Sequence, residues 1–361
     1  MSARIAHQLD VYACSPQSPV ARGDEVEGRT VIGFTFDHDP PAGEPGDRLL
    51  LDGDQDLPRP PARPVPSVLD PSSVDITRCG PTPADGLDED ALTVPPPGLR
   101  AGYERVVDGM GDHGGLLRGV LDELAKREHS TWLVGGAVRD LLADGAEAQV
   151  HDLDFTGTAG PGELNEVAFW RRRRRDGFGD YDWRVSPQLV WSISPQEFPQ
   201  RRVMEYRPLA LDGFAFPAYG GSLATDAGTR DLTVNALYYD PRRGVVADPT
   251  GLGHTHLRAV PLVMAIAYRD DAPVACACVI LRCLKFGLRW PDADIDGATK
   301  WIGGLPADLT ARIPAEGWPR ILTTWASCVQ PRHRDTGQKD LARRLGPVAA
   351  ALVAAILERT A

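Results

Sequence analysis

The chain has 361 residues, of which 42% are hydrophobic, so it is long enough for two domains with a sizeable core. Its formal net charge of -11 at pH 7 argues against a protein that coats nucleic acid along its whole surface. The six cysteines lack paired CxxC spacing, which argues against a disulfide framework, and no run approaches the ~20 apolar residues of a membrane span. Because no apolar secretion signal follows the N-terminus, we expect a cytoplasmic protein without a membrane partner.

The first 100 residues differ in composition from the remainder of the chain. They hold 17 acidic and 8 basic side chains, whereas the other 261 residues hold 33 and 31, which is compatible with a local basic groove. They also contain half of the 32 prolines, and such a segment cannot sustain long helices. The run from Thr30 to Phe36 predicts a strand. We therefore expect residues 1–110 to be an acidic, proline-rich extension with a small β element.

A strand, a turn and a helix are predicted in the middle of the chain. Apolar residues at helical spacing predict a helix from Leu116 to Lys126, and the apolar run from Thr131 to Val134 predicts a buried strand. Gly135 and Gly136 form the turn into a predicted helix over 137–143. Backbone N–H groups at such a turn can cradle phosphates.

Two aspartates follow on a short run with β character, from Val150 to Phe155. Residues two apart in a strand project to the same face, so the carboxylates of Asp152 and Asp154 are predicted to point the same way. Paired hard oxygen ligands suit Mg²⁺.

Further elements are predicted after the aspartates. A helix starts near Pro161, two strands follow over 185–193 and 202–206, and beyond Leu262 the pattern is mainly helical. An α+β domain over 111–260 with a mixed β-sheet is thus followed by an α-helical region over 261–361. The cysteines at 276, 278 and 283 are interpreted as small buried thiols on a helix.

An arginine run lies in the α+β part, with aromatic residues nearby. Its members are Arg171, Arg172, Arg173, Arg174 and Arg175. Arginines bind phosphates and aromatic rings stack on bases, so the run is a candidate RNA contact. A solvated helix end explains it equally well, and both interpretations stay open.

Three stretches, in order, resemble a known family. They are LVGGAVRDLL at 133–142 with DLDF at 152–155, RDLTVNAL at 230–237, and DPTG at 248–251; a weaker match is LRCLKF at 281–286. These are similar to the GGxVRDxLL with DxD, RRDFTINAL, DPxGG and LRxxRF elements of class II tRNA nucleotidyltransferases and bacterial poly(A) polymerases. That family belongs to the DNA polymerase beta-like nucleotidyltransferases.

The resemblance implies a polymerase beta-like head followed by a helical neck and body, and transfer of a nucleotide from an NTP, ATP and/or CTP, to an RNA 3′ end. It implies two Mg²⁺ ions held by Asp152 and Asp154, with Glu205 as a candidate third carboxylate that could instead be a surface strand residue. The residues it assigns to nucleotide binding are Gly135, Gly136, Arg139, Asp140, Arg230, Asp231, Asn235, Arg282 and Lys285.

The chain departs from the family where the base is read. The family reads its incoming base with an EDxxR helix, but in the ungapped register those positions are Ala275, Cys276 and Val279. A site without that fork loses the hydrogen bonds that discriminate bases. Two alternatives therefore stay open, namely an enzyme that modifies a small molecule or a protein, and a non-catalytic RNA-binding relative.

Overall fold

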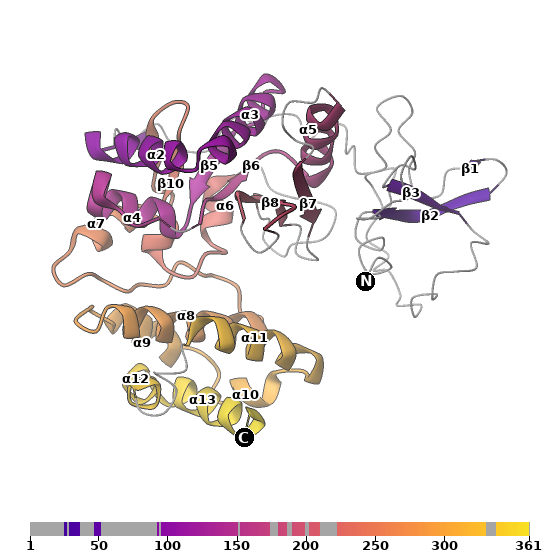
Figure 1. Ribbon diagram of the computed structural model, residues 1–361. Coiled ribbons are helices and arrows are strands. Elements are labelled where there is room, and N and C mark those ends of the chain that lie inside the picture. Colours follow the sequence, from indigo (N-terminus) through magenta and orange to yellow (C-terminus); the bar gives the residue numbers. More distant parts are fainter. Residues whose placement is uncertain are drawn as a thin grey trace.

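The computed structural model contains a mixed β-sheet covered by helices, followed along the chain by a region whose described elements are all helical (Figure 1). The residues that the structure describes are 25–26, 29–36, 47–51, 92–93, 95–150, 152–173, 180–185, 190–198, 202–209, 222–329 and 337–360. We call residues 92–272 the sheet region and residues 273–360 the helical region.

A small antiparallel sheet lies near the N-terminus. Its strands, in spatial order, are β1 (Glu25–Val26), β2 (Arg29–Phe36) and β3 (Asp47–Leu51). The strand predicted over 30–36 is therefore confirmed as β2.

The main sheet has eight strands in the order β4-β11-β10-β5-β6-β9-β8-β7. Their bounds are β4 (Leu92–Thr93), β5 (Thr131–Val134), β6 (Asp154–Gly157), β7 (Tyr181–Val185), β8 (Trp191–Pro195), β9 (Met204–Pro208), β10 (Tyr238–Asp240) and β11 (Val245–Ala247). Neighbours pair antiparallel except β6 and β9, which are parallel. The sheet is thus mixed, as expected for the α+β class.

One predicted strand is wrong. The run over 185–193 is not a single strand, because Val185 ends β7 and Trp191 begins β8, and these two residues face each other across an antiparallel pair. The second predicted strand, over 202–206, is confirmed in β9, which starts two residues later, at Met204.

Helices cover the face of the sheet that carries Leu133, Phe155 and Tyr239. They are α2 (Pro97–Gly109), α3 (Asp112–Lys126), α4 (Gly136–Asp144) and α5 (Pro161–Arg173), with α2, α3 and α4 grouped around β5 in Figure 1. Short elements complete the region, namely η3 (Gly145–Glu147), α6 (Leu223–Ala227), η5 (Thr233–Asn235) and α7 (Gly253–Arg258). The helices predicted over 116–126 and 137–143 are confirmed as α3 and α4.

The sheet region begins earlier than the boundary predicted at residue 110. Strand β4 pairs with β11 at the edge of the main sheet, and Leu99, Tyr103 and Val107 of α2 are buried in the same core as α3. Helix α2 can begin inside a proline-rich segment because Pro97 occupies its first turn, where a missing N–H costs nothing. The division at residue 110 itself stays a prediction.

The helical region is organised around α8 (Pro273–Arg289). The other elements are α9 (Asp296–Gly303), α10 (Leu309–Arg312), η6 (Ala315–Gly317), α11 (Trp318–Cys328), α12 (Gly337–Leu345) and α13 (Pro347–Thr360). Helix α8 ends just before Trp290, whose successor, Pro291, disfavours helical backbone at the preceding residue. On α8 the thiols of Cys276 and Cys283 are free and buried, which agrees with their interpretation as packing residues, whereas the free thiol of Cys278 is only partly buried.

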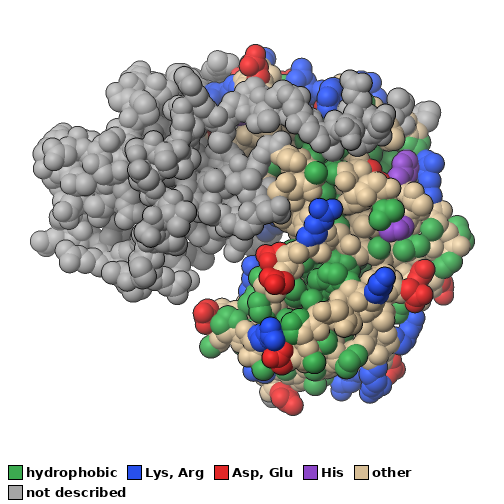
Figure 2. All heavy atoms as spheres, turned by 180° about the vertical axis from the view of Figure 1, so that it is seen from behind, with side chains coloured by type: hydrophobic (Ala, Val, Ile, Leu, Met, Phe, Trp, Pro, Cys, Tyr) green, Lys and Arg blue, Asp and Glu red, His purple; other side chains and the backbone are tan. Residues whose placement is uncertain are grey.

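The two regions share one apolar core. Leu232, Val234 and Met264 of the sheet region are fully buried in the same cluster as α8 and α11. Acidic and basic side chains are interspersed over the face seen in Figure 2, where neither sign dominates the described surface. Among the described helices, none is long and apolar enough to span a membrane.

Candidate active site

Two carboxylates meet where β6 begins. Asp154 is the first residue of β6, and it lies directly beside Glu205 in the parallel pairing with β9. Both side chains are partly buried. Burial raises the pKa of Asp154 above its ordinary value, and the charge of Asp152 raises it further.

Asp152 lies near Asp154, but the two residues are not aligned by a shared strand as predicted. It is exposed and precedes β6, so alternation along a strand does not align it with Asp154. The two side chains nevertheless lie close enough for their charges to interact. Both carboxylates are therefore brought together, but by the segment that leads into the strand.

Glu205 lies close to both aspartates. Burial raises its pKa above its ordinary value, as do the negative charges of Asp154 and Asp152 and a hydrogen bond with Asp154. An ion pair with Arg202 acts in the opposite direction. Glu205 is thus placed where a third catalytic carboxylate is required, and its role stays a prediction.

The chemistry of these carboxylates fits a divalent cation. Carboxylate oxygens are the hard ligands that Mg²⁺ prefers, and a cation would relieve the repulsion that, after burial, raises the pKa of Asp154 and of Glu205. Within the described residues, however, no three His, Cys, Asp or Glu side chains already surround one point in a way that would hold a metal.

The glycine turn lies beside the carboxylates. Gly135 follows β5 with φ 70° and ψ -137°, a conformation that only glycine adopts without strain, and it precedes the first residue of α4. A Cβ atom built on Gly135 would be 4.0 Å from Oδ2 of Asp154. Unpaired amides at the start of α4 therefore adjoin the carboxylates, an arrangement that suits a phosphate and its metal.

Arg139 and Asp140 lie one turn further along α4. Arg139 is only 3% exposed, and it donates from Nε to Oδ1 of Asp140 and from Nη1 to Oδ1 of Asn235, at 2.9 and 2.6 Å. The nucleotide-binding role of this pair stays a prediction, but in the structure Arg139 is directed toward protein groups.

The element over 230–235 is bonded into the same network. Asp231 accepts hydrogen bonds from Nδ2 of Asn235 at 2.8 Å and from Nε of Arg282 at 2.5 Å. These bonds hold the pKa of Asp231 below its ordinary value despite its burial. Residues predicted from two separate motifs are thus joined in one chain of hydrogen bonds.

Arg230 belongs to a neighbouring cluster centred on Asp226, which the sequence analysis missed. The buried carboxylate of Asp226 accepts from Nη2 of Arg230 at 2.7 Å, Nη2 of Arg207 at 2.9 Å and the Tyr238 hydroxyl at 2.7 Å. Thr229, which stands where the family has an arginine, accepts from the same Nη2 of Arg207. No periodicity or motif marks Asp226, since two of its partners, Arg207 and Tyr238, come from strands β9 and β10.

A family model matches the part of the chain that holds these residues. The match covers residues 131–262 and its description is the Poly A polymerase head domain. Residues 131–262 therefore resemble this domain, and we call them the head domain. The glycine turn, the carboxylates and the element over 230–235 all fall within the head domain.

Solved structures also resemble the chain at low identity. A tRNA nucleotidyltransferase complexed with a primer tRNA and an incoming ATP analog has 19% identity and TM-score 0.41, covering 63% of this chain and 60% of that one. The Thermotoga maritima CCA-adding enzyme complexed with tRNA has 16% identity and TM-score 0.46, covering 65% and 51%. The Bacillus stearothermophilus CCA-adding enzyme in complex with CTP has 22% identity and TM-score 0.44, covering 64% and 56%.

The matched part spans about half to three fifths of those structures. No curated protein matches the sequence.

The arginine run lies only partly within the described residues. Arg171 packs its guanidinium against Gly119 of α3, within the helices that cover the main sheet. Helix α5 continues to Arg173, and Arg174 and Arg175 lie outside the described residues. The RNA-binding prediction for this run is therefore untested, while Arg171 itself has an intramolecular neighbour.

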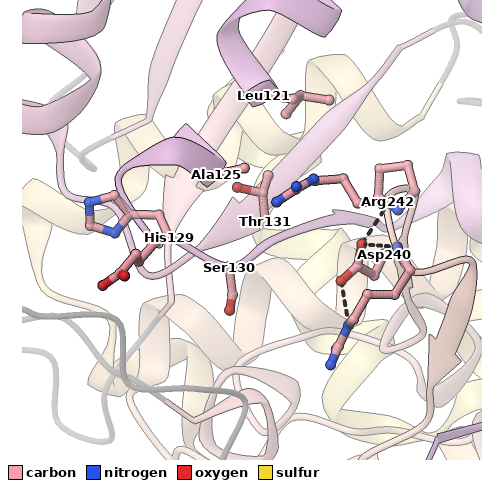
Figure 3. Close-up of a pocket in the computed structure, with 10 residues that line it drawn as sticks. Leu121, Ala125, His129, Ser130, Thr131, Asp240 and Arg242 are labelled. Atoms are coloured by element: carbon pink, nitrogen blue, oxygen red, sulfur yellow. Dashed lines mark hydrogen bonds and ion pairs between the residues drawn. The ribbon is translucent and has the colours of Figure 1, made fainter. Parts of the chain in front are cut away.

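A cavity of about 390 Å³ lies at the other end of β5 from the glycine turn (Figure 3). It is lined by α3, by Ser130 and Thr131, and by the β10–β11 turn with Asp240 and Arg242. Thr131 pairs with Gly157, at the far end of β6 from Asp154, so the cavity is separate from the carboxylates.

Replacing Gly135 tests the turn. We expect Gly135→Ala to destabilise the protein by about 1–3 kcal/mol, because an alanine at this φ is strained, and to shift the α4 amides away from Asp154. Gly115→Ala in α3 is the matched control, since an added Cβ there meets nothing within 4 Å and a helical alanine is favoured. Urea unfolding of both variants would measure the difference; equal stability would contradict the strain.

Proposed function

We propose that the chain is a nucleotidyltransferase that moves a nucleoside monophosphate from an NTP to a hydroxyl group and releases pyrophosphate. The observation that carries the proposal is the position of Asp154 and Glu205 beside the Gly135 turn, within a poly(A) polymerase head domain. The pairing of acidic side chains with free helix amides suits a triphosphate bound through metal.

Each group of predicted site residues has a separate proposed role. Asp152 and Asp154, with Glu205, would hold Mg²⁺, which when bound neutralises the triphosphate and activates the attacking hydroxyl. The amides after Gly135 would donate hydrogen bonds to phosphate oxygens. Asp231 and Asn235, held by Arg282, would fix the sugar or the triphosphate end of the nucleotide, so that the reacting atoms meet in line.

We propose RNA as the acceptor class, with a tRNA-like 3′ end as the first candidate. The support is the resemblance of the motifs and the description of the matching family. Basic side chains of α8 that lie near the head domain, among them Arg282 and Lys285, would add favourable charge for a polyanionic partner.

One observation favours a second candidate, a nucleotidyltransferase with a different acceptor or a relaxed base choice. Helix α8 contains no Asp, Glu, Asn, Gln, Ser, Thr or His, so it offers no strong side-chain acceptor for an exocyclic amino group. Cys276 and Val279, which replace family base-reading positions, are buried in the helical core. This second candidate would transfer the nucleotide to a small molecule or a protein.

Both candidates are tested by one assay. Pure protein is incubated with each labelled NTP, Mg²⁺, and either tRNA lacking its 3′ end or a cell extract. Labelled tRNA supports an RNA acceptor, and a labelled product of another kind supports the second candidate. The absence of both labelled product and pyrophosphate with every NTP and acceptor would refute transfer and favour a non-catalytic relative.

Removing metal is a separate test of the carboxylates. We expect chelation with EDTA to abolish pyrophosphate release and added Mg²⁺ to restore it, because the carboxylates alone cannot neutralise a triphosphate. Circular dichroism before and after chelation is the control for unfolding. Undiminished release in excess EDTA would contradict a metal-dependent site.

A further inference from the structure

Arg139 lies at the contact between the head domain and α8. The residue is only 3% exposed; its Nε donates to Asp140 and its Nη1 to Asn235, while its Nη2 forms an ion pair with Asp140 at 2.8 Å. Arginine is the residue best suited to such a place, since its planar fork pairs with several acceptors while its faces stay free for stacking.

Two aromatic rings from the end of α8 pack against this guanidinium. The rings of Phe286 and Trp290 stack at 4.9 Å and 14°, and the guanidinium carbon of Arg139 lies 5.3 and 5.1 Å from their centroids. Arg289 also lies over Trp290 and reaches Oδ2 of Asp140 at 3.5 Å. We call these five residues, Arg139, Asp140, Phe286, Arg289 and Trp290, the head–neck latch.

The latch is connected to the carboxylates through backbone and side-chain bonds. The N–H of Arg139 donates to the carbonyl of Gly135 at 3.2 Å, and Gly135 adjoins Asp154. On its other side, Arg139 bonds Asn235, which bonds Asp231. A movement of the end of α8 would therefore displace both the glycine turn and the predicted nucleotide-binding element.

We propose that Arg139 is a positioning residue that couples the placement of α8 to the geometry of the carboxylate site, and not a ligand of the nucleotide phosphates. The inference rests on the proposed function for its catalytic consequence. Its structural part, the coupling of α4 to the end of α8, stands independently of any activity.

Hydrogen exchange of the full-length protein tests the coupling without a substrate. We expect Arg139→Lys, which keeps the charge and loses the planar fork, to speed amide exchange in both 136–144 and 282–290, with strands β5 and β6 unchanged. The matched control is Arg243→Lys. Arg243 also pairs with an aspartate, at 2.7 Å from Asp240, and lies 5.1 Å from the Trp132 ring, away from α8 (Figure 3 shows Asp240).

The control should leave exchange at 282–290 at the wild-type rate. Faster exchange confined to 136–144 in Arg139→Lys would overturn the coupling. If Arg139→Lys speeds amide exchange throughout the chain, a second variant, Trp290→Leu, tests the coupling from the α8 side. The inference then requires that Trp290→Leu speed amide exchange in residues 136–144.

Steady-state kinetics separate positioning from phosphate binding. We expect Arg139→Lys to lower kcat about 10-fold or more with KM within about 3-fold, since misplaced catalytic groups slow the bound substrate. A rise in KM with unchanged kcat would make Arg139 a substrate ligand and overturn the inference. If the wild-type protein transfers no nucleotide, the proposed function fails, and the exchange measurement alone decides the latch.

Discussion

Asp154→Asn is expected to lower the rate of nucleotidyl transfer by about 10³-fold or more, which corresponds to about 4 kcal/mol of lost transition-state stabilisation. The substitution keeps the shape of the side chain and removes the charge that would hold the metal beside the glycine turn. Pyrophosphate release under saturating NTP measures the loss.

The fold should tolerate this change. Burial and the charge of Asp152 disfavour the ionised form of Asp154, so an uncharged amide relieves repulsion. Asp122→Asn on the exposed side of α3 is the control and should retain full activity. If Asp154→Asn transferred nucleotide at the wild-type rate with unchanged metal dependence, Asp154 would have no role in the reaction.

The largest effect on stability is expected at Asp226. Asp226→Asn should lower the free energy of unfolding by about 3–5 kcal/mol, because Arg207 and Arg230 would keep their charges near a buried site without a counterion. The carboxylate is fully buried and also accepts a hydrogen bond from Tyr238, so water would not compensate the arginine charges after the substitution. Chemical denaturation of the purified variant measures the difference.

An exposed ion pair provides the matched comparison. Asp308 pairs with Arg312 at 2.8 Å, and both side chains are more than half exposed. Asp308→Asn should change the unfolding free energy by about 0.5 kcal/mol or less, since solvent screens such pairs. Similar losses of unfolding free energy in the two variants would show that the charge of Asp226 does not stabilise the protein.

Local patterns predicted the elements that lead up to the glycine turn and the turn itself. The helix over 116–126, the strand over 131–134 and the glycine turn follow from short-range spacing, and each is present. The strand over 185–193 failed because the run joins the end of β7 to the start of β8, and apolar composition alone does not detect a change of direction.

The same distinction between local patterns and tertiary packing applies to the predicted site residues. Asp154 and Gly135 are neighbours because β5 and β6 pair directly, which a strand–turn–helix pattern can anticipate. Arg139 and Asn235 are 96 residues apart in sequence, and Asp226 collects partners from β9 and β10. Such contacts depend on tertiary packing, so sequence motifs indicate the residues and not their partners.

The core shared by the two regions limits how far this protein can be treated as modular. The family match ends at residue 262, but Leu232, Val234 and Met264 pack among the side chains of α8 and α11. Cutting the chain there would expose apolar surface directly beneath Asp231 and Asn235. Exchanging the helices for those of a relative would therefore require redesign of the element over 230–235 itself, because its side chains and those of the helices form one core.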